Sequence, residues 1–162
     1  METSLRQWGA KWGRILGAPA ELIDTITSIE SSFYPQTQNM TERAVPLGGA
    51  WGPMQVTLTT AKGIAAALAK NPNAEVQETL ARWTGQGPDL YDPALGMLFG
   101  VSYLAKLWKK FQDFTLAAAA YQQGPGKITK MLAAGQAIPE ELPPHGKQYV
   151  AMATAARDRL FG

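Results

Sequence analysis

Residues 91–111, with the sequence YDPALGMLFGVSYLAKLWKKF, constrain the fold more than any other segment of the chain. Asp92 is a good helix cap, and Pro93 suits the first helical position, where an amide hydrogen would have no partner in any case. Large apolar side chains then recur at helical spacing along one face: Leu95, Leu98, Phe99, Leu104, Leu107, Trp108 and Phe111. We predict that this segment is the central helix of the fold.

Helix start and stop signals recur along the rest of the chain, whereas the alternation typical of strands does not. We therefore predict an all-α, mainly helical fold. Residues 36–52 are polar or rich in Gly and Pro and are predicted to form a long loop, of the kind that tends to carry function. Further helices are expected at residues 4–17, 18–35, 57–72 and 73–87, as a pair meeting near 120–127, and from PPHGKQYVAM to the end of the chain.

Length and composition favour one globular domain spanning residues 1–162, because 46% of the residues are hydrophobic and can fill a core. The net charge of +2 is too small and too scattered for a nucleic-acid-binding surface, so no nucleic-acid partner is expected. With no Cys and one His, His145, which we place in a surface loop, no metal site or other cofactor is predicted. No stretch approaches the roughly 18 apolar residues of a membrane span, and no signal-peptide pattern is visible.

One carboxylate, Glu30, follows a run of isoleucines in the segment SIESSFYP. At about 100° per residue, Glu30 falls between Ile23 and Ile26 on the apolar stripe of the predicted 18–35 helix. Burial penalises an ionised carboxyl and raises its pKa, and a Glu that is protonated near neutral pH can act as a general acid. The alternative is that the last turn frays and Glu30 reaches water or a cation. Four polar residues are expected on the other side of this helix: Asp24, Thr27, Ser28 and Ser31.

Four segments follow one another in an order that resembles a known family: IESSFYP, GAWGPMQVT, LYDPALGMLFGVSYLAKL and AAAAYQQGPGKI. They are similar to the Glu-Ser-x-Phe, Gly-x-Met-Gln, Asp-Pro plus Gly-x-x-Tyr-Leu, and Ala-Tyr-Asn-x-Gly-Pro-Gly blocks of the lytic transglycosylase (SLT) domain. This domain belongs to the goose-type lysozyme-like superfamily, and the resemblance covers about residues 20–130. It implies a lysozyme-like fold with a polysaccharide-binding cleft, and an enzyme that acts on the glycan strands of peptidoglycan.

The resemblance also implies a reaction, in which a single Glu cleaves the β-1,4 bond between MurNAc and GlcNAc and leaves a 1,6-anhydro-MurNAc end. Glu30 would be the catalytic acid and base, and the hydroxyl of Tyr121 would lie near it. Beside the family blocks, Trp51 is a candidate platform for a sugar ring, although tryptophans at helical spacing are more often core residues. The residues expected to bind substrate are Ser31, Met54, Gln55, Gln122 and Trp51. Two of them have an alternative interpretation: Met54 as a core residue and Gln55 as a solvated loop amide. Tyr121 could likewise be a buried structural tyrosine.

The chain departs from the family pattern at several positions. Gln122 stands where the family has Asn after Ala-Tyr, and Gly96 stands where an Asn is frequent. The segment between Glu30 and Gly52 is also longer than in compact members, which predicts a different roof over the cleft. These departures affect substrate trimming and subsite preference more than the class of reaction.

Two other functions fit the same residues. A goose-type lysozyme would hydrolyse the same bond with water and needs a second carboxylate, for which Asp24 and Asp92 are poorly placed, so that Glu42 is the remaining candidate. An inactive cell-wall-binding or virion-structural module would have kept only the fold. The expected place of action is the cell wall, in the periplasm or outside the cell. A bacteriophage protein, working with other virion or secretion-complex proteins, is one hypothesis for how the chain arrives there.

Overall fold

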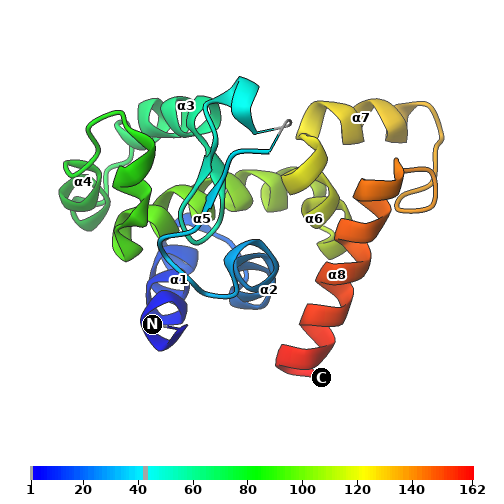
Figure 1. The fold of residues 1–162 in the computed structure, drawn as a ribbon, viewed down its shortest axis with the longest axis horizontal. Helices are drawn as coiled ribbons and strands as arrows, with labels where there is room; N and C mark the ends of the chain where they lie inside the picture. Colours follow the sequence, from blue (N-terminus) through cyan, green and yellow to red (C-terminus); the bar gives the residue numbers. More distant parts are fainter. Residues whose placement is uncertain (1, 42–43) are drawn as a thin grey trace.

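The computed structural model describes residues 2–41 and 44–162, so Glu42 lies outside the described residues. The described chain is mainly helical, which confirms the predicted fold class (Figure 1). Its α-helices are α1 (Glu2–Leu16), α2 (Ala20–Ser31), α3 (Leu58–Leu68), α4 (Ala74–Leu80), α5 (Pro93–Phe111), α6 (Phe114–Gln123), α7 (Pro125–Ala133) and α8 (Pro144–Phe161). None of the helices in the described ranges has both the length and the apolar character needed to cross a membrane.

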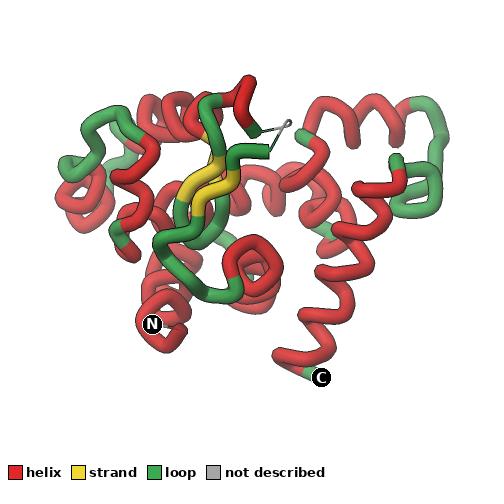
Figure 2. Tube along the Cα trace, viewed as in Figure 1, coloured by secondary structure: helices red, strands yellow, loops and turns green. Residues whose placement is uncertain are grey.

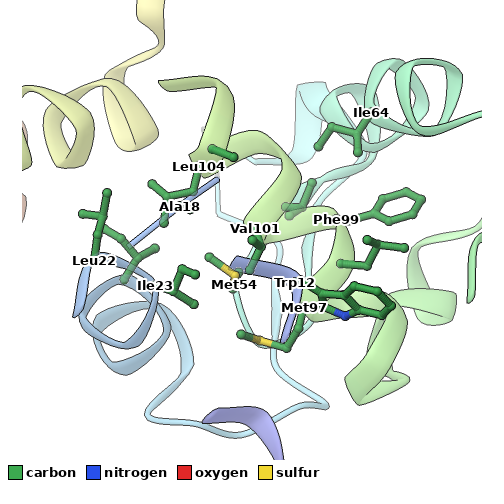
Figure 3. Packing of buried hydrophobic residues seen from close by; sticks show 14 of the residues in the cluster. Trp12, Ala18, Leu22, Ile23, Met54, Ile64, Met97, Phe99, Val101 and Leu104 are labelled. Atoms are coloured by element: carbon green, nitrogen blue, oxygen red, sulfur yellow. The ribbon is translucent and has the colours of Figure 1, made fainter. Parts of the chain in front are cut away.

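The predicted central helix is confirmed as α5, which crosses the middle of the fold between α1 and α3 (Figure 1). Its N-terminus is capped as expected, because Oδ1 of Asp92 accepts a hydrogen bond from the amide of Ala94 at 2.9 Å. The indole of the fully buried Trp12 donates to the carbonyl of Ala94 at 3.0 Å and ties α1 to the start of α5. Figure 3 shows the apolar side chains that α1, α2, α3 and α5 contribute to this core.

The prediction that residues 36–52 form only a loop is wrong in part. Three strands of two residues each pair in the order β1–β2–β3: β1 (Gln38–Asn39), β2 (Ala50–Trp51) and β3 (Val56–Thr57) (Figure 2). Both pairings are antiparallel, with Asn39 opposite Ala50 and Trp51 opposite Val56. Of the two 3₁₀ helices in the described residues, η1 (Val45–Leu47) lies between β1 and β2 in the sequence, and η2 (Gly87–Tyr91) lies between α4 and α5. Strands of two residues are too short to show an alternating pattern, so the sequence had no periodic signal for them.

The second helix ends earlier than predicted, at Ser31 rather than near Pro35. Ser32 caps it in the left-handed conformation (φ 52°) and Phe33 follows with φ 60°, so two consecutive residues turn the chain out of the helix. A non-glycine residue in this region costs roughly 1–2 kcal/mol. Phe33 is nevertheless buried in the core, and that packing offsets the conformational cost.

The polar residues expected on the outer side of α2 are a second correction. Asp24, Thr27 and Ser28 are buried, because α1 and α8 both pack against α2. The hydroxyl of Thr27 donates to the carbonyl of Ile23 at 2.8 Å, and Arg159 of α8 donates to the hydroxyl of Ser28 at 2.8 Å. The helix is therefore enclosed over most of its circumference, which a single helical wheel does not predict.

The helix expected at residues 73–87 ends at Leu80, as α4, and the remaining corrections concern helix starts. The first helix begins at Glu2 instead of at the predicted cap Ser4. The last helix begins at Pro144, so His145 lies in its first turn rather than in a loop, although it is exposed as expected.

Two glycines of α5 allow the turn at residues 52–55 to lie directly on this helix. A Cβ at Gly96 would be 2.3 Å from the carbonyl oxygen of Leu90 and 2.7 Å from Cδ of Pro53. A Cβ at Gly100 would be 2.3 Å from Sδ and 2.5 Å from Cβ of Met54. The glycine at position 96, where the family often has Asn, is thus needed in this chain for close packing.

Candidate active site

Glu30 lies in the last turn of α2, half-buried, with its carboxylate facing α8. The hydroxyl of Tyr149 donates a hydrogen bond to Oε2 of Glu30 at 2.9 Å. Burial raises the pKa of Glu30 from 4.5 to about 7, and the Tyr149 hydrogen bond opposes this rise without cancelling it. Within the described part of the chain, Glu30 forms no ion pair. The alternative, in which the last turn frays and Glu30 pairs with a cation, is therefore not observed there.

Sequence reasoning missed Tyr149. Its ring is buried on the inner face of α8 together with Val150, Ala153 and Ala156. The apolar stripe of the last helix predicts that the tyrosine is buried and that its hydroxyl needs a hydrogen-bond partner. The stripe does not indicate which residue that partner is. Burial and the negative charge of Glu30 raise the pKa of Tyr149 well above its usual value, so this hydroxyl keeps its proton and remains a donor.

We expect Tyr149→Phe to move the alkaline limb of the pH–rate profile to higher pH by about one unit. The hydroxyl stabilises the charged carboxylate, and without it Glu30 holds its proton to a higher pH. The measurement is kcat/KM between pH 5 and pH 9 on the glycan strands that the family resemblance implies as substrate. Tyr91→Phe, which removes a hydroxyl from η2, is the control and should leave the limb in place. A limb that moves to lower pH in Tyr149→Phe would contradict the assigned role.

The hydroxyl of Tyr121, which was predicted to lie near Glu30, forms its hydrogen bond with another group. It donates to the carbonyl oxygen of Met54 at 2.6 Å. Burial raises the pKa of Tyr121 well above its usual value, and the charge of Glu30 adds to this rise. The ring packs against Tyr103, with the ring centroids 5.4 Å apart. Met54 itself is fully buried in the core, where its side chain packs on Gly100 of α5, and Figure 3 shows it among the core residues.

Ser31 and Gln55 are both fixed by backbone carbonyls. The hydroxyl of Ser31 donates to the carbonyl of Pro53 at 2.6 Å. Nε2 of Gln55 donates to the carbonyls of Thr37 at 2.9 Å and of Gly52 at 2.8 Å. The Gln55 side chain is 8% exposed, so it is not a solvated loop amide, and its buried Oε1 has no hydrogen-bond donor among the described residues.

A hollow of about 250 Å³ lies beside these residues, between the β3–α3 junction on one side and the end of α6 on the other. Gln55, Tyr103, Tyr121 and Gln122 line it. The side chains of Gln122 and Gln123 are hydrogen-bonded to each other. The hollow is therefore lined by Tyr121 and by the side-chain amides of Gln55, Gln122 and Gln123, which can bind hydroxyl and acetamido groups.

Trp51 does not line this hollow. Its indole donates to the carbonyl of Gly48 at 2.9 Å, and its ring packs against Gly87 and against Tyr91, 5.9 Å away between centroids. Its role as a sugar platform stays a prediction.

Among the site residues, Gln55 has φ 50°, and Ser32 and Phe33 next to Glu30 also have positive φ. Such strain tends to gather at functional sites, where the surrounding structure holds it in place.

The fold is that of the lysozyme-like lytic transglycosylases. The 70 kDa soluble lytic transglycosylase of Escherichia coli matches with a TM-score of 0.65 and 22% identity, over 90% of this chain and 22% of that one. An inactive glutamate-to-glutamine mutant of the lytic transglycosylase Slt of Pseudomonas aeruginosa matches with a TM-score of 0.65 and 22% identity, over 96% and 24% of the two chains. The chain thus spans about a quarter of the length of these enzymes.

The transglycosylase SLT domain family matches residues 9–141, and this chain belongs to that family. The family predicted from the four sequence blocks is confirmed, and the match extends beyond the 20–130 range that those blocks cover. No curated protein sequence matches the chain.

Proposed function

We propose that this chain cleaves the glycan strand of peptidoglycan as a lytic transglycosylase, with Glu30 acting first as acid and then as base. The observation that carries the proposal is the carboxyl at the end of α2, whose pKa burial raises to about 7. A group with this pKa is available in both protonation states near neutral pH, which suits a residue that must give and then take a proton. Membership of the SLT family supports the same reaction.

The proposed sequence begins with a protonated Glu30, which donates its proton to the glycosidic oxygen between MurNAc and GlcNAc. The bond from this oxygen to C1 of MurNAc breaks, and the N-acetyl group of the same sugar stabilises the cation that forms. The Glu30 carboxylate then takes the proton of the 6-hydroxyl, and O6 bonds to C1. The products are a new GlcNAc end and a 1,6-anhydro-MurNAc end, and Glu30 is protonated again for the next cycle.

The neighbours of Glu30 have supporting roles in this proposal. Tyr149 orients the carboxylate through its hydrogen bond, and Tyr121 covers one side of the site from α6. Oε1 of Gln55, which has no donor among the described residues, is suited to accept a hydrogen bond from a sugar hydroxyl or acetamido group. Ser31 and Met54 support the site through Pro53 and through the core, and Gln122 borders the hollow.

A hydrolytic mechanism needs a second carboxylate, about 5 Å from the acid in a retaining enzyme and further away in an inverting one. No carboxylate among the described residues contributes to the raised pKa of Glu30, whose only side-chain partner is Tyr149. This favours chemistry by one carboxylate. The candidate Glu42 lies outside the described residues and is tested directly below.

We expect digestion of purified peptidoglycan to yield muropeptides that are one water lighter than hydrolysis products, because the anhydro ring forms without water. Mass spectrometry of the digest measures this difference. Glu42→Gln should leave the anhydro products and their rate unchanged. Reducing ends that disappear in Glu42→Gln would instead identify a two-carboxylate lysozyme, and an absence of any products would indicate a binding module.

This function places the action of the protein at the cell wall. Association with a virion or with a secretion complex is a separate hypothesis. It rests on the sequence analysis alone, and the genes that neighbour this reading frame would test it.

A further inference from the structure

The last helix, α8, runs along one edge of the molecule and packs on α2 and α6 with its inner face (Figure 1). The outer face borders a shallow, open hollow of about 620 Å³, and the loop before the helix adds Pro139 and Glu140 to its walls. The lining residues that α8 itself supplies are Lys147, Val150, Ala151, Thr154, Ala155 and Asp158. All of these except Val150 are exposed, so this side of α8 is open to a partner.

The outer face of α8 has one charge of each sign, one near each end. Lys147 and Asp158 are 11 residues apart, which is about three helical turns, so they lie almost on one line along the helix. Their backbones are about 16 Å apart, and the two cannot pair with each other. Neither forms an ion pair with any described residue. Between them lie Ala151, Thr154 and Ala155, whose small side chains let a second helix approach closely.

These two charges do not stabilise their own helix. The dipole of a helix favours anions near its N-terminus and cations near its C-terminus. In α8 the order is reversed, because Lys147 lies close to the start at Pro144 and Asp158 lies in the last turn before Phe161. A second copy of the helix, laid antiparallel on the first, would bring each charge to its opposite.

We propose that the outer face of α8 is an interface between two copies of this chain, whose α8 helices pair antiparallel about a twofold axis. Lys147 of each copy then faces Asp158 of the other, and the same register brings the exposed Phe161 of each copy to Pro144 of the other. The face is self-complementary, as a twofold interface requires. The hydrogen bond from Tyr149 to Glu30 lies on the inner side of α8, so the inference does not rest on the proposed function.

The test uses two charge reversals, Lys147→Glu and Asp158→Lys. The first leaves only negative charges at these two positions and the second only positive charges. Both changes agree with the helix dipole, so α8 should be no less stable, and melting curves check this. The matched controls, Lys62→Glu and Glu78→Lys, reverse exposed charges on α3 and α4, on the opposite side of the molecule (Figure 1).

We expect sedimentation equilibrium at low salt to show a dimer of the wild-type chain that forms between about 1 µM and 1 mM, the range for a small interface. Each reversal should weaken dimerisation by at least about ten-fold, because two attractive contacts become repulsive. The chain with both reversals should dimerise as wild type does, since its charges only exchange ends. An equimolar mixture of the two single-reversal chains should form a mixed dimer, and both controls should match wild type.

A wild-type chain that stays monomeric over this range would overturn the inference and leave the face to a partner of another kind. Reversals that behave like the controls, or a mixture that forms no mixed dimer, would also contradict it. If a reversal changes the melting temperature, Ala151→Arg gives the same comparison, because it places a bulky side chain at the centre of the face. Failure of the proposed function is a separate result, seen as missing products from a chain whose dimer is unaltered.

Discussion

Glu30→Gln is expected to abolish turnover of peptidoglycan while leaving the fold intact. General acid–base catalysis contributes about 10²- to 10⁴-fold, and here one residue is proposed to serve both steps, so the loss should reach or exceed that range. The glutamine amide is nearly isosteric and can still accept the hydrogen bond from Tyr149. A zymogram and a product assay by mass spectrometry measure the loss. Activity retained within ten-fold of wild type would remove Glu30 from the proposed role.

The same variant should change the pH dependence of stability in a defined direction. The pKa of Glu30 is about 7 in the folded chain against 4.5 for the free side chain, so folding favours the protonated form. Below pH 4.5 both states are protonated and Glu30 costs nothing. As the pH rises through about 7, the folded state loses stability, by an amount on the order of 3 kcal/mol.

Glu30→Gln has no such titration, and its free energy of unfolding should exceed that of wild type at pH 8 while the two agree at pH 4. Denaturant unfolding at both pH values measures this difference. Equal stabilities at pH 8 would mean that the carboxyl is not penalised by burial, and the main support for a catalytic acid would be lost.

Gly100→Ala is expected to destabilise the fold strongly, although the residue lies outside the catalytic groups. Its Cβ would meet Sδ of Met54 at 2.3 Å and Cβ of Met54 at 2.5 Å, so either the 52–55 turn or α5 has to move. Overpacking of this kind typically costs about 1–3 kcal/mol, and more where backbone must shift. Catalysis should also fall, because the carbonyl of Met54 holds the hydroxyl of Tyr121. Thermal unfolding and kcat together measure both effects.

Gly63→Ala is the matched control for stability. Gly63 is exposed on α3, and a Cβ at this position meets nothing within 4 Å. The control should gain about 0.5–1 kcal/mol, because alanine favours helix more than glycine does. If Gly100→Ala behaves like this control, the close contact between α5 and the 52–55 turn does not constrain the fold.

Local signals in the sequence were sufficient for the helices. Asp92 and Thr57 cap the helices predicted for them, because a cap depends on neighbours within three residues. The sheet had no comparable signal. The end of α2 had none either, because Ser32 and Phe33 adopt the left-handed conformation although neither is a glycine or an asparagine, the residues that usually mark such a turn. The predictions of the sheet and of the end of α2 failed because these features depend on the residues that pack around them and not on neighbours in the sequence.

The same limit applies to the site. Glu30 could be singled out because its apolar neighbours share its helix. Its partner Tyr149 could not, because 119 residues separate them in the chain and the contact forms only when α8 packs on α2. The family blocks located Gln55 and Tyr121, yet not their hydrogen bonds to backbone carbonyls of distant segments.

Ser31 and Tyr121 come from different helices, and their hydroxyls bind the carbonyls of consecutive residues, Pro53 and Met54. The helix that carries the acid and the helix that carries Tyr121 are thus both held by two consecutive peptide units, which rest on α5. Among the described residues of the stretch that joins β1 to β2, none takes part in these two hydrogen bonds. We therefore expect that changes in the length of that stretch would leave the spacing between Glu30 and Tyr121 unchanged.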